Sequence, residues 1–208
     1  SRQYPSPGLI TSGITQISPG IDSGYVIKDD GSLWGFGDNT YGQLGDGTKI
    51  EQQTPIRIEE SAVRRVDAAR YHCLYVKTDG SLRGMGENES GQLGDGTTSE
   101  RNASIQILPS GVSEVSTNWY HTLLIKTDGS LWAMGKNNYG QLGDGTTTDR
   151  LTPVQIVSSG ITKIATGRHH SFFLDVHGTL WGMGLNGSGR LGDGTTTARS
   201  TPVQVASG

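Results

Sequence analysis

Three histidines recur at a constant spacing and are of a type that could hold a catalytic metal ion. His72, His121 and His170 follow one another at steps of 49 residues, and Ser23 stands one step before the first of them. Three imidazoles with an open fourth position form a zinc site that can activate a water molecule. However, no carboxylate accompanies each histidine, and the earliest copy of the position lacks the imidazole. The pattern favours hydrogen-bonded structural histidines, and we expect no metal.

A second recurring set could bind calcium through oxygen ligands. An aspartate followed by Gly and Thr occurs at Asp46, Asp95, Asp144 and Asp193. An EF-hand loop needs oxygen ligands at positions 1, 3 and 5 and a closing Glu at position 12. Counting from Asp38 places Thr40 and Gly42 at the second and third ligand positions, and later copies replace the first acid by Lys136 and Leu185. The set instead indicates a turn in which Asp caps local amides and Gly supplies positive φ.

An asparagine also recurs in every copy, seven residues before each of these aspartates. Its positions are Asn39, Asn88, Asn137 and Asn186. Asparagine tolerates left-handed φ and hydrogen-bonds the backbone of its own loop. We expect these side chains to have that structural role.

The sequence contains no signature of an enzyme. No Gly-x-Ser-x-Gly elbow presents a nucleophile, and the glycine-rich loops follow neither Walker nor Rossmann spacing. Cys73 is the only cysteine, which excludes an internal disulfide, and its apolar neighbours in YHCLYVK predict a buried side chain. We expect no catalytic activity and no cofactor.

The residues that differ most among the copies precede the recurring histidine position. Trp, Tyr and Arg, which dominate the binding energy at protein interfaces, are frequent there. Variable loops on a constant frame are a common way to present a recognition surface. The candidate binding residues are Ile21, Asp22, Arg70, Tyr71, Trp119, Tyr120, Arg168 and His169. The alternative is that Tyr71 and Tyr120 are loop aromatics half covered by their neighbours, with a packing role only.

All these positions recur because the chain is a tandem repeat. The stretch 128–146, DGSLWAMGKNNYGQLGDGT, has counterparts that begin at Asp30, Asp79 and His177. Such a period marks units that bury their apolar surface only against neighbouring units. The predicted units are 13–61, 62–110, 111–159 and 160–208, and residues 1–12 resemble the last strand of a preceding unit. We interpret the four units as one domain.

Each unit contains four strand-forming runs. In the first unit these are ITQI at 14–17, GYVIK at 24–28, LWGFG at 33–37 and TPIRI at 54–58. Asp-Gly between the second and third runs predicts a hairpin in which both turn residues adopt positive φ. Pro55 favours an edge position for the fourth strand because proline cannot donate to a ladder. Without any helical periodicity, the sequence predicts an all-β fold, a β-propeller of four four-stranded blades.

Composition restricts the partners. The formal net charge is −3 and the Lys and Arg residues are dispersed. Nucleic acid is therefore not expected as a partner, because even non-specific binding needs clustered cations. No apolar run is long enough to predict a membrane span.

The motif DGSLWGFGDNTYGQLGDGT resembles the regulator of chromosome condensation repeat, and the resemblance covers essentially the whole chain. It implies propeller blades and a structural role for the recurring histidine. Secreted β-lactamase-inhibitor propellers of similar blades bind their target through aromatics at the place of the eight candidates. The resemblance thus implies a non-enzymatic protein-binding module, extracellular or on a bacterial cell surface. A cytosolic location is the alternative, since it is compatible with one buried cysteine. The alternatives are guanine-nucleotide exchange on a small GTPase, for which no wedge interrupts these equal units, and a purely structural repeat.

Ring closure is left open by the sequence. Blades of this family imply a ring of about seven, so four would cover only about half a circle and leave two unpaired edges. Unpaired edges are prone to associate. We expect either that this chain is a segment of a larger propeller or that two chains pair about a two-fold axis into an eight-bladed ring.

Overall fold

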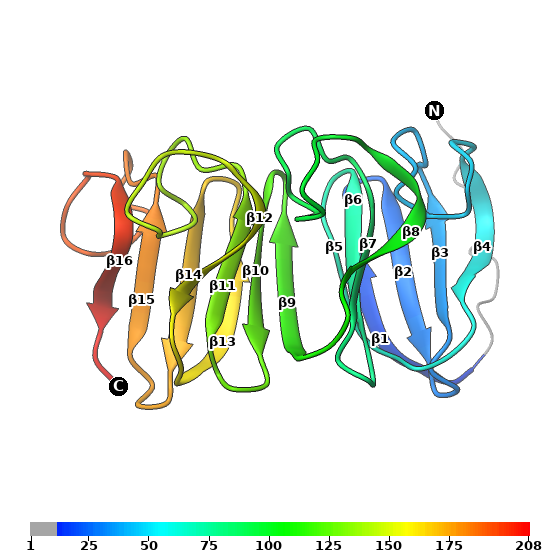
Figure 1. The fold of residues 1–208 in the computed structure, drawn as a ribbon, viewed down its shortest axis with the longest axis horizontal. Coiled ribbons are helices and arrows are strands. Elements are labelled where there is room, and N and C mark those ends of the chain that lie inside the picture. Colours follow the sequence, from blue (N-terminus) through cyan, green and yellow to red (C-terminus); the bar gives the residue numbers. More distant parts are fainter. Residues whose placement is uncertain (1–11) are drawn as a thin grey trace.

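The protein consists of sixteen β-strands in four antiparallel sheets, named blades 1 to 4 in chain order (Figure 1). Blade 1 comprises β1 (Ile14–Pro19), β2 (Ser23–Lys28), β3 (Leu33–Gly37) and β4 (Gln52–Glu59). Blade 2 comprises β5 (Val63–Ala68), β6 (His72–Lys77), β7 (Leu82–Gly86) and β8 (Arg101–Leu108). Blade 3 comprises β9 (Val112–Asn118), β10 (His121–Lys126), β11 (Leu131–Gly135) and β12 (Arg150–Val157). Blade 4 comprises β13 (Ile161–Thr166), β14 (His170–Asp175), β15 (Leu180–Gly184) and β16 (Arg199–Ala206).

The computed structural model describes residues 12–208, and within that range no residue is helical. No helix long and apolar enough to span a bilayer is therefore found in this part of the chain. The architecture confirms the predicted all-β fold of four four-stranded blades. The unit limits inferred from the repeat stay a prediction. The leader at 1–12 lies, up to residue 11, outside the described residues.

The hairpin turn between the second and third strands differs in detail from the prediction. Gly31 has a φ of 75°, but Ala62 is the only residue other than glycine with positive φ in the described chain. Asp30 therefore keeps an ordinary φ, and the expectation of two positive values is wrong. The reason is that the Asp30 carboxylate accepts the backbone N–H of Ser32 at 2.8 Å, which stabilises the turn through the side chain.

The fourth strand, which contains proline in blades 1, 3 and 4, lies at the edge of its sheet, as the sequence predicts. In blade 1 the order is β1-β2-β3-β4, and the other blades repeat it. Pro55 lies in β4, which pairs with β3 alone. A missing N–H costs least at such an edge.

The hydrophobic core lies between the blades rather than within any one of them. One cluster joins Tyr25 and Leu33 of blade 1 to Val63 and Val66 of blade 2. Equivalent clusters join blade 2 to blade 3 and blade 3 to blade 4. Each blade is thus stabilised mainly by its neighbours, because its own sheet is a single layer.

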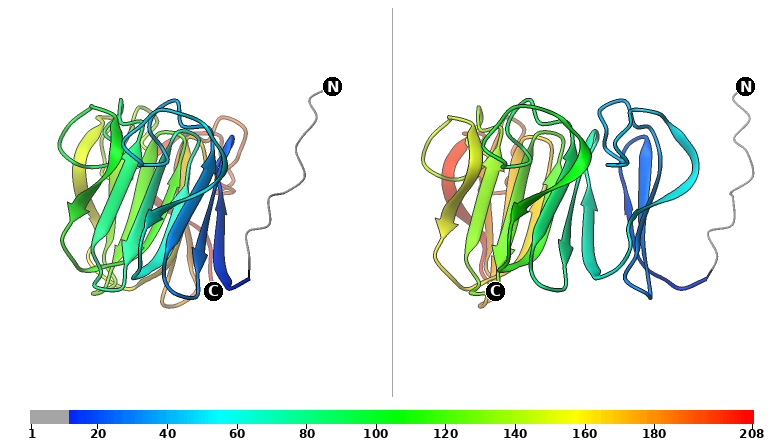
Figure 2. Two further views of the ribbon diagram at one scale, coloured as in Figure 1. Left: turned by 90° about the vertical axis from the view of Figure 1, so that its right-hand side faces the viewer. Right: turned by 45° about the vertical axis from the view of Figure 1, so that its right-hand side comes forward.

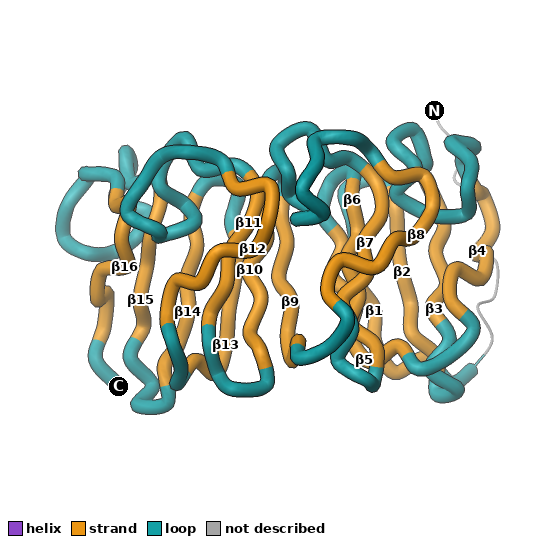
Figure 3. The backbone as a smooth tube through the Cα atoms, in the orientation of Figure 1, coloured by secondary structure: helices purple, strands orange, loops and turns teal. Residues whose placement is uncertain are grey.

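The glycine-rich loop after the third strand reaches over the next blade, and we call this loop the strap (teal at the top of Figure 3). The straps of blades 1, 2 and 3 each make one equivalent backbone hydrogen bond, from an N–H of the Asp-Gly-Thr motif to a carbonyl of the next outer strand. At 2.8 Å each, the pairs are Gly47 to Asn102, Gly96 to Leu151 and Gly145 to Ser200. The recurring motif therefore connects consecutive blades.

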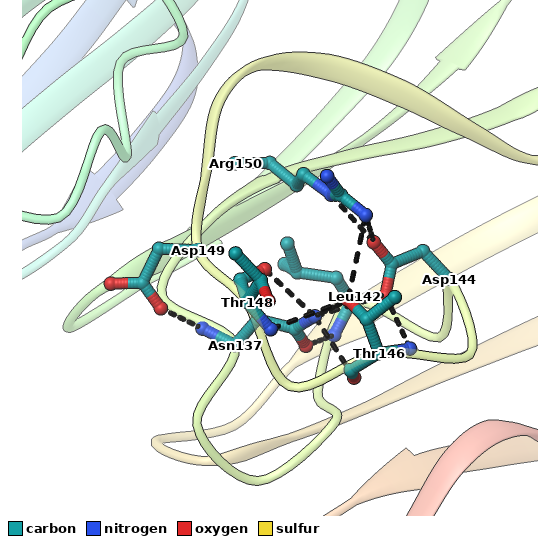
Figure 4. Close-up of polar contacts among 7 residues, drawn as sticks. All are labelled: Asn137, Leu142, Asp144, Thr146, Thr148, Asp149 and Arg150. Atoms are coloured by element: carbon teal, nitrogen blue, oxygen red, sulfur yellow. Dashed lines mark hydrogen bonds and ion pairs between the residues drawn. The ribbon is translucent and has the colours of Figure 1, made fainter.

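The recurring asparagine closes the strap from inside (Figure 4). The Asn137 side-chain N–H donates to the Asp144 carboxylate at 3.0 Å and to the Thr148 carbonyl at 3.1 Å. Its Oδ1 accepts the backbone N–H of Leu142 at 3.0 Å. The predicted bonding to the backbone is confirmed, whereas the predicted tolerance of left-handed φ is not used, since no asparagine in the described chain has positive φ.

The blades form an open row rather than a closed ring. Blade 1 and blade 4 lie at opposite ends of the molecule (Figures 1 and 2). Contacts between strands of different blades join neighbours in the row, such as β1 with β5, β5 with β9 and β9 with β13. Within residues 12–208, one face of blade 1 and one face of blade 4 consequently have no blade packed against them.

Candidate protein-binding face

The loops between the first and second strands share one end of the molecule with the straps, at the top of Figure 1. In each sheet consecutive strands are neighbours. Every second connection of such an antiparallel sheet therefore returns to the same end. We call this end, with the side chains of both loop types, the loop face. It carries all eight candidate residues.

Four candidates form a continuous row of cations and aromatic rings across three blades. The Arg70 guanidinium carbon lies 4.4 Å from the ring centre of Tyr71 and 4.5 Å from that of Trp119. Arg168 covers the same tryptophan at 4.1 Å. We call Tyr71, Arg70, Trp119 and Arg168 the cation–aromatic row. Such pairs attract each other through the quadrupole of the ring, so the row holds its loops in one arrangement.

Two further candidates extend the row sideways. The ring centres of Trp119 and Tyr120 are 5.7 Å apart, and the Tyr120 ring stacks on His169 with centres 6.2 Å apart and planes 14° from parallel. These three side chains are half-buried, while Arg168 is exposed. The rings therefore pack against one another and still present part of their surface to solvent.

The candidates of blade 1 lie at one end of the cation–aromatic row and take no part in its stacking. Ile21 is 55% exposed. Asp22 lines a cleft of about 640 Å³ together with Asp38, Glu51 and Tyr71. The structure thus joins six of the eight candidates and leaves Ile21 and Asp22 at one end of the loop face.

Sequence reasoning missed three residues that the straps bring to the same face. Tyr41 packs on Tyr71 with ring centres 4.5 Å apart, and Tyr139 packs on His169 at 5.0 Å. Lys136 lies 4.7 Å from the ring centre of Tyr120. A signal was present, because the tyrosine position in the strap alternates between Tyr and Ser from copy to copy within an otherwise constant motif.

Charge is unevenly distributed along the loop face. The blade 1 end carries Asp22, Asp38 and Glu51 around its cleft, whereas Lys136 and Arg168 lie toward the blade 4 end. Between these ends, burial raises the pKa of Glu87 to about 7, and repulsion by Glu89 adds to the rise although Arg70 and Lys136 oppose it. A partner of matching charge polarity would be oriented by this face.

The recurring histidines lie beneath the loop face, at the junctions between blades. His72 Nε2 lies 2.6 Å from the Thr117 hydroxyl of blade 3, and His121 Nε2 lies 2.8 Å from the Ser171 hydroxyl of blade 4. Ser171 in turn donates to the carbonyl of Gln141 at 2.8 Å. His72 and His121 therefore each connect their own blade to the next. In residues 12–208 no three His, Cys, Asp or Glu side chains are close enough together to hold a metal ion.

We expect His121 to make stability fall in acid. Burial, with smaller contributions from neighbouring histidines, lowers the pKa of His121 from 6.5 to about 3. Between these values the unfolded chain binds a proton that the folded chain does not bind. The stabilisation is therefore complete above pH 6.5 and is lost as the pH falls toward 3. The unfolding free energy of the wild type relative to His121→Gln should fall by about 2 kcal/mol between pH 7 and pH 5.

Denaturant titrations of both proteins at the two pH values measure this difference. Asp67 and Glu87 change the unfolding free energy with pH in the opposite direction, because burial raises their pKa values to about 6 and about 7. Both proteins contain these two residues, so their contribution cancels in the comparison. A difference that does not change with pH would show that His121 is protonated in the folded protein.

The carboxylate of Asp144 is already occupied by protein donors. It accepts the Thr146 hydroxyl at 2.8 Å and the Arg150 guanidinium at 2.6 Å (Figure 4). Burial opposes its ionisation, but these hydrogen bonds outweigh burial and hold the pKa of Asp144 below its ordinary value. The arrangement is that of a capped turn, in which the Arg150 guanidinium occupies the side of the carboxylate where a metal ion would bind.

Comparison with known proteins identifies the family of this chain. The family model described as the RCC1-like domain matches residues 2–208, nearly the whole chain. The chain belongs to the RCC1-like domain family. A search of curated proteins gives no significant match.

Solved structures of the RCC1-like family share the fold. Yeast RCC1 (Prp20), in a crystal structure with Kap60, superposes with a TM-score of 0.83 at 19% identity, covering 96% of this chain and 50% of its own. Prp20p from Saccharomyces cerevisiae, in a structure described with its binding to Gsp1p and histones, gives 0.81 at 19%, covering 96% and 52%. Human WBSCR16 gives 0.82 at 25%, covering 94% and 54%. This RCC1-like chain therefore spans about half the length of these proteins.

Proposed function

We propose that this RCC1-like chain is a non-enzymatic protein-binding module that uses its loop face. The observation that carries the proposal is the cation–aromatic row, in which Arg70, Trp119 and Arg168 from three blades stack without interruption. Trp, Tyr and Arg are the residue types that contribute most to binding at interface centres. Here they are joined on a rigid frame.

The contacts within the cation–aromatic row are compatible with a binding role as well as with packing. Rings that are already stacked lose little conformational entropy when a partner covers them, so packing and binding reinforce each other. The half-exposed surfaces of Trp119 and Tyr120 remain available for such a partner. A module of this kind fits an extracellular or bacterial cell-surface protein, which is the location we propose.

We expect the double substitution Trp119→Ala and Tyr120→Ala to weaken binding by about 2 kcal/mol or more, roughly thirtyfold. The thermal midpoint should change little, because both side chains are only half-buried in loops. Wild type and variant are immobilised in parallel on a resin, and proteins retained by the wild type alone are identified. Their dissociation constants are then measured by calorimetry.

A matched control is Trp34→Ala, since Trp34 is half-buried and carries Lys28 at 4.3 Å from its ring centre but lies in β3, away from the loop face. This control should bind like the wild type. Equal losses of binding and of stability in the double variant would favour the packing role and reject the proposal.

The second candidate function is guanine-nucleotide exchange on a small GTPase. The likeness to Prp20p, whose structure is described with its binding to Gsp1p, is the observation that favours it. The test is release of fluorescent GDP from a small GTPase of the Gsp1p type, with and without the chain. Faster release would replace our proposal, and unchanged release would support non-enzymatic binding.

A further inference from the structure

The open row of four blades has two end faces, and the junctions between its blades show which residues each face carries. At the junction of blades 2 and 3, blade 2 contributes Leu74, Val76, Leu82 and Leu93, and blade 3 contributes Val112, Val115, Leu124 and Met134. We call the first set of positions the outward face of a blade and the second set the inward face. Every inner junction joins one outward face to one inward face, because all blades repeat the same sequence pattern.

The inward face of blade 1 has the right residues but no neighbour. Ile17 is 70% exposed, while Val66 and Val115 at the same repeat position are 2% and 8% exposed. Ile14 is 41% exposed, and its counterpart Val112 is fully buried. Two large apolar side chains therefore face solvent, because no blade within residues 12–208 packs on this face.

The outward face of blade 4 is the complementary case. Phe172, Leu174 and Leu180 are half-buried and line a shallow apolar groove of about 250 Å³. Their counterparts in blade 2, Leu74 and Leu82 among them, are fully buried. An outward face and an inward face are thus both left open in one chain.

Backbone groups at the two end faces are also complementary. At each inner junction the N–H of the first residue of the inner strand donates to a turn glycine of the preceding blade, as Val112 does to Gly80 at 2.9 Å. The corresponding end groups are the N–H of Ile14 and the carbonyl of Gly178. Likewise the strap of blade 4 carries the N–H of Gly194, and β4 carries the matching carbonyl of Gln53.

One hydrogen bond of the inner junctions has no acceptor side chain on the blade 4 end face and no donor N–H on the blade 1 end face. At the first two inner junctions a side chain of one blade accepts a backbone N–H of the next blade, as Ser18 does from Ala68 at 2.9 Å and Asp67 does from Thr117 at 2.7 Å. At the third junction the equivalent Ser116 hydroxyl pairs with the Thr166 hydroxyl at 3.0 Å. Blade 4 has Ala165 at the acceptor position, and blade 1 has Pro19 at the donor position. Since proline has no N–H, pairing the two faces would leave no unsatisfied backbone donor at this position.

Charge permits the same pairing. The repeat position that faces the centre of the row carries Gln16, Arg65, Glu114 and Lys163, and Arg65 pairs with Glu114 across blades at 3.0 Å. Lys163 of an outward face would meet Gln16 of an inward face, which brings no like charges together. The histidine position differs, because His170 would meet Pro19 and Gly24 instead of a hydroxyl. The end pairing therefore lacks one hydrogen bond that inner junctions have.

We propose that the outward face of blade 4 binds the inward face of blade 1 in a second copy of this chain. Because the two faces differ, two copies form two identical junctions about a two-fold axis and close an eight-bladed ring. The pairing continues the interface already repeated three times inside the chain, and it covers both apolar end faces at once. It leaves the loop faces of both copies at one end of the ring, since consecutive blades all direct these loops the same way.

Light scattering on the purified chain across a range of concentrations tests the stoichiometry. The expected mass is twice the 22.1 kDa of the chain, with dissociation on dilution. A mass of one chain at all concentrations would overturn the proposal. A ladder of ever larger species would overturn the closed ring, because it would show that the junction rotates by something other than half a turn.

Two variants test which faces meet. Ile17→Asp damages only the inward face of blade 1, and Leu174→Asp damages only the outward face of blade 4. Each variant alone should be monomeric, and an equimolar mixture should form a dimer through its one intact junction. A dimer of either variant alone would show that like faces pair, which contradicts the proposal.

The matched control is Ile50→Asp, because Ile50 is 68% exposed, nearly as much as Ile17, but lies in the strap of blade 1. It should dimerise like the wild type. Circular dichroism melting of every variant accompanies the mass measurement, and the mixing result separates lost pairing from misfolding, since a misfolded chain would not recover mass in the mixture.

Discussion

Substitution of Gly135 by alanine is expected to destabilise the protein by about 4 kcal/mol, from left-handed strain and a backbone clash together. Gly135 ends β11 with a φ of 101°, a conformation that residues with a side chain rarely adopt. An added Cβ would lie 2.5 Å from the carbonyl oxygen of Tyr120 and 2.8 Å from the Cα of His121. Both are main-chain atoms, so they cannot rotate away as a flexible side chain could.

The clash would also reach the candidate site. The Tyr120 carbonyl that the new methyl group displaces accepts the backbone N–H of Lys136 at 2.9 Å, and both residues belong to the loop face. Denaturant unfolding measures the loss of stability. The control is Gly111→Ala, whose φ is 84° but whose added Cβ would have no atom within 4 Å.

For Gly111→Ala we expect a loss of about 1 kcal/mol, from the left-handed conformation alone. Similar losses at Gly111 and Gly135 would mean that the backbone around Tyr120 yields easily. The frame beneath the cation–aromatic row would then be softer than its packing suggests.

Substitution of Asn137 by alanine is the second large effect, with an expected loss of about 3 kcal/mol, because it leaves buried polar groups of the strap without partners. Asn137 is fully buried. Its removal deprives the Leu142 N–H of its acceptor and the Asp144 carboxylate and Thr148 carbonyl of a donor. Leu142 is fully buried, so water could not replace the lost acceptor of its N–H without opening the strap.

The matched control is Asn138→Ala, one residue further along the chain and exposed to solvent. Its stability should lie within about 0.5 kcal/mol of the wild type. Thermal melts of the two variants decide the matter. Equal melting temperatures would falsify the view that the asparagine network holds the strap on the next blade.

Much of the blade could be predicted from the sequence because its causes are local. Alternation of apolar residues, the Asp-Gly turn and Pro55 each act over a few residues, so the sequence alone indicates strands, a hairpin and an edge. The errors were local as well. Asp30 and Asn137 were expected to use positive φ, but their side chains stabilise the backbone by hydrogen bonds instead, leaving positive φ to glycine.

The candidate face could be located only in outline. Variation among the copies pointed to the loops that carry Arg70, Trp119 and Arg168, and the structure stacks these side chains. The same reasoning missed Tyr41 and Tyr139, because it considered each loop type separately and could not show that straps and loops meet at one end. It also placed Ile21 with the others, although its loop lies beyond the end of the row.

By itself, the sequence determined the repeat, the four strands of each unit, their order in the sheet and the residue types available at each junction. Only the tertiary structure decided which residues meet across junctions, such as His121 with Ser171 or Gly96 with Leu151. Such partners lie 50 or more residues apart in the chain, so their contact depends on the angle between consecutive blades. That angle results from the packing of side chains in three interblade cores, and no local pattern encodes it.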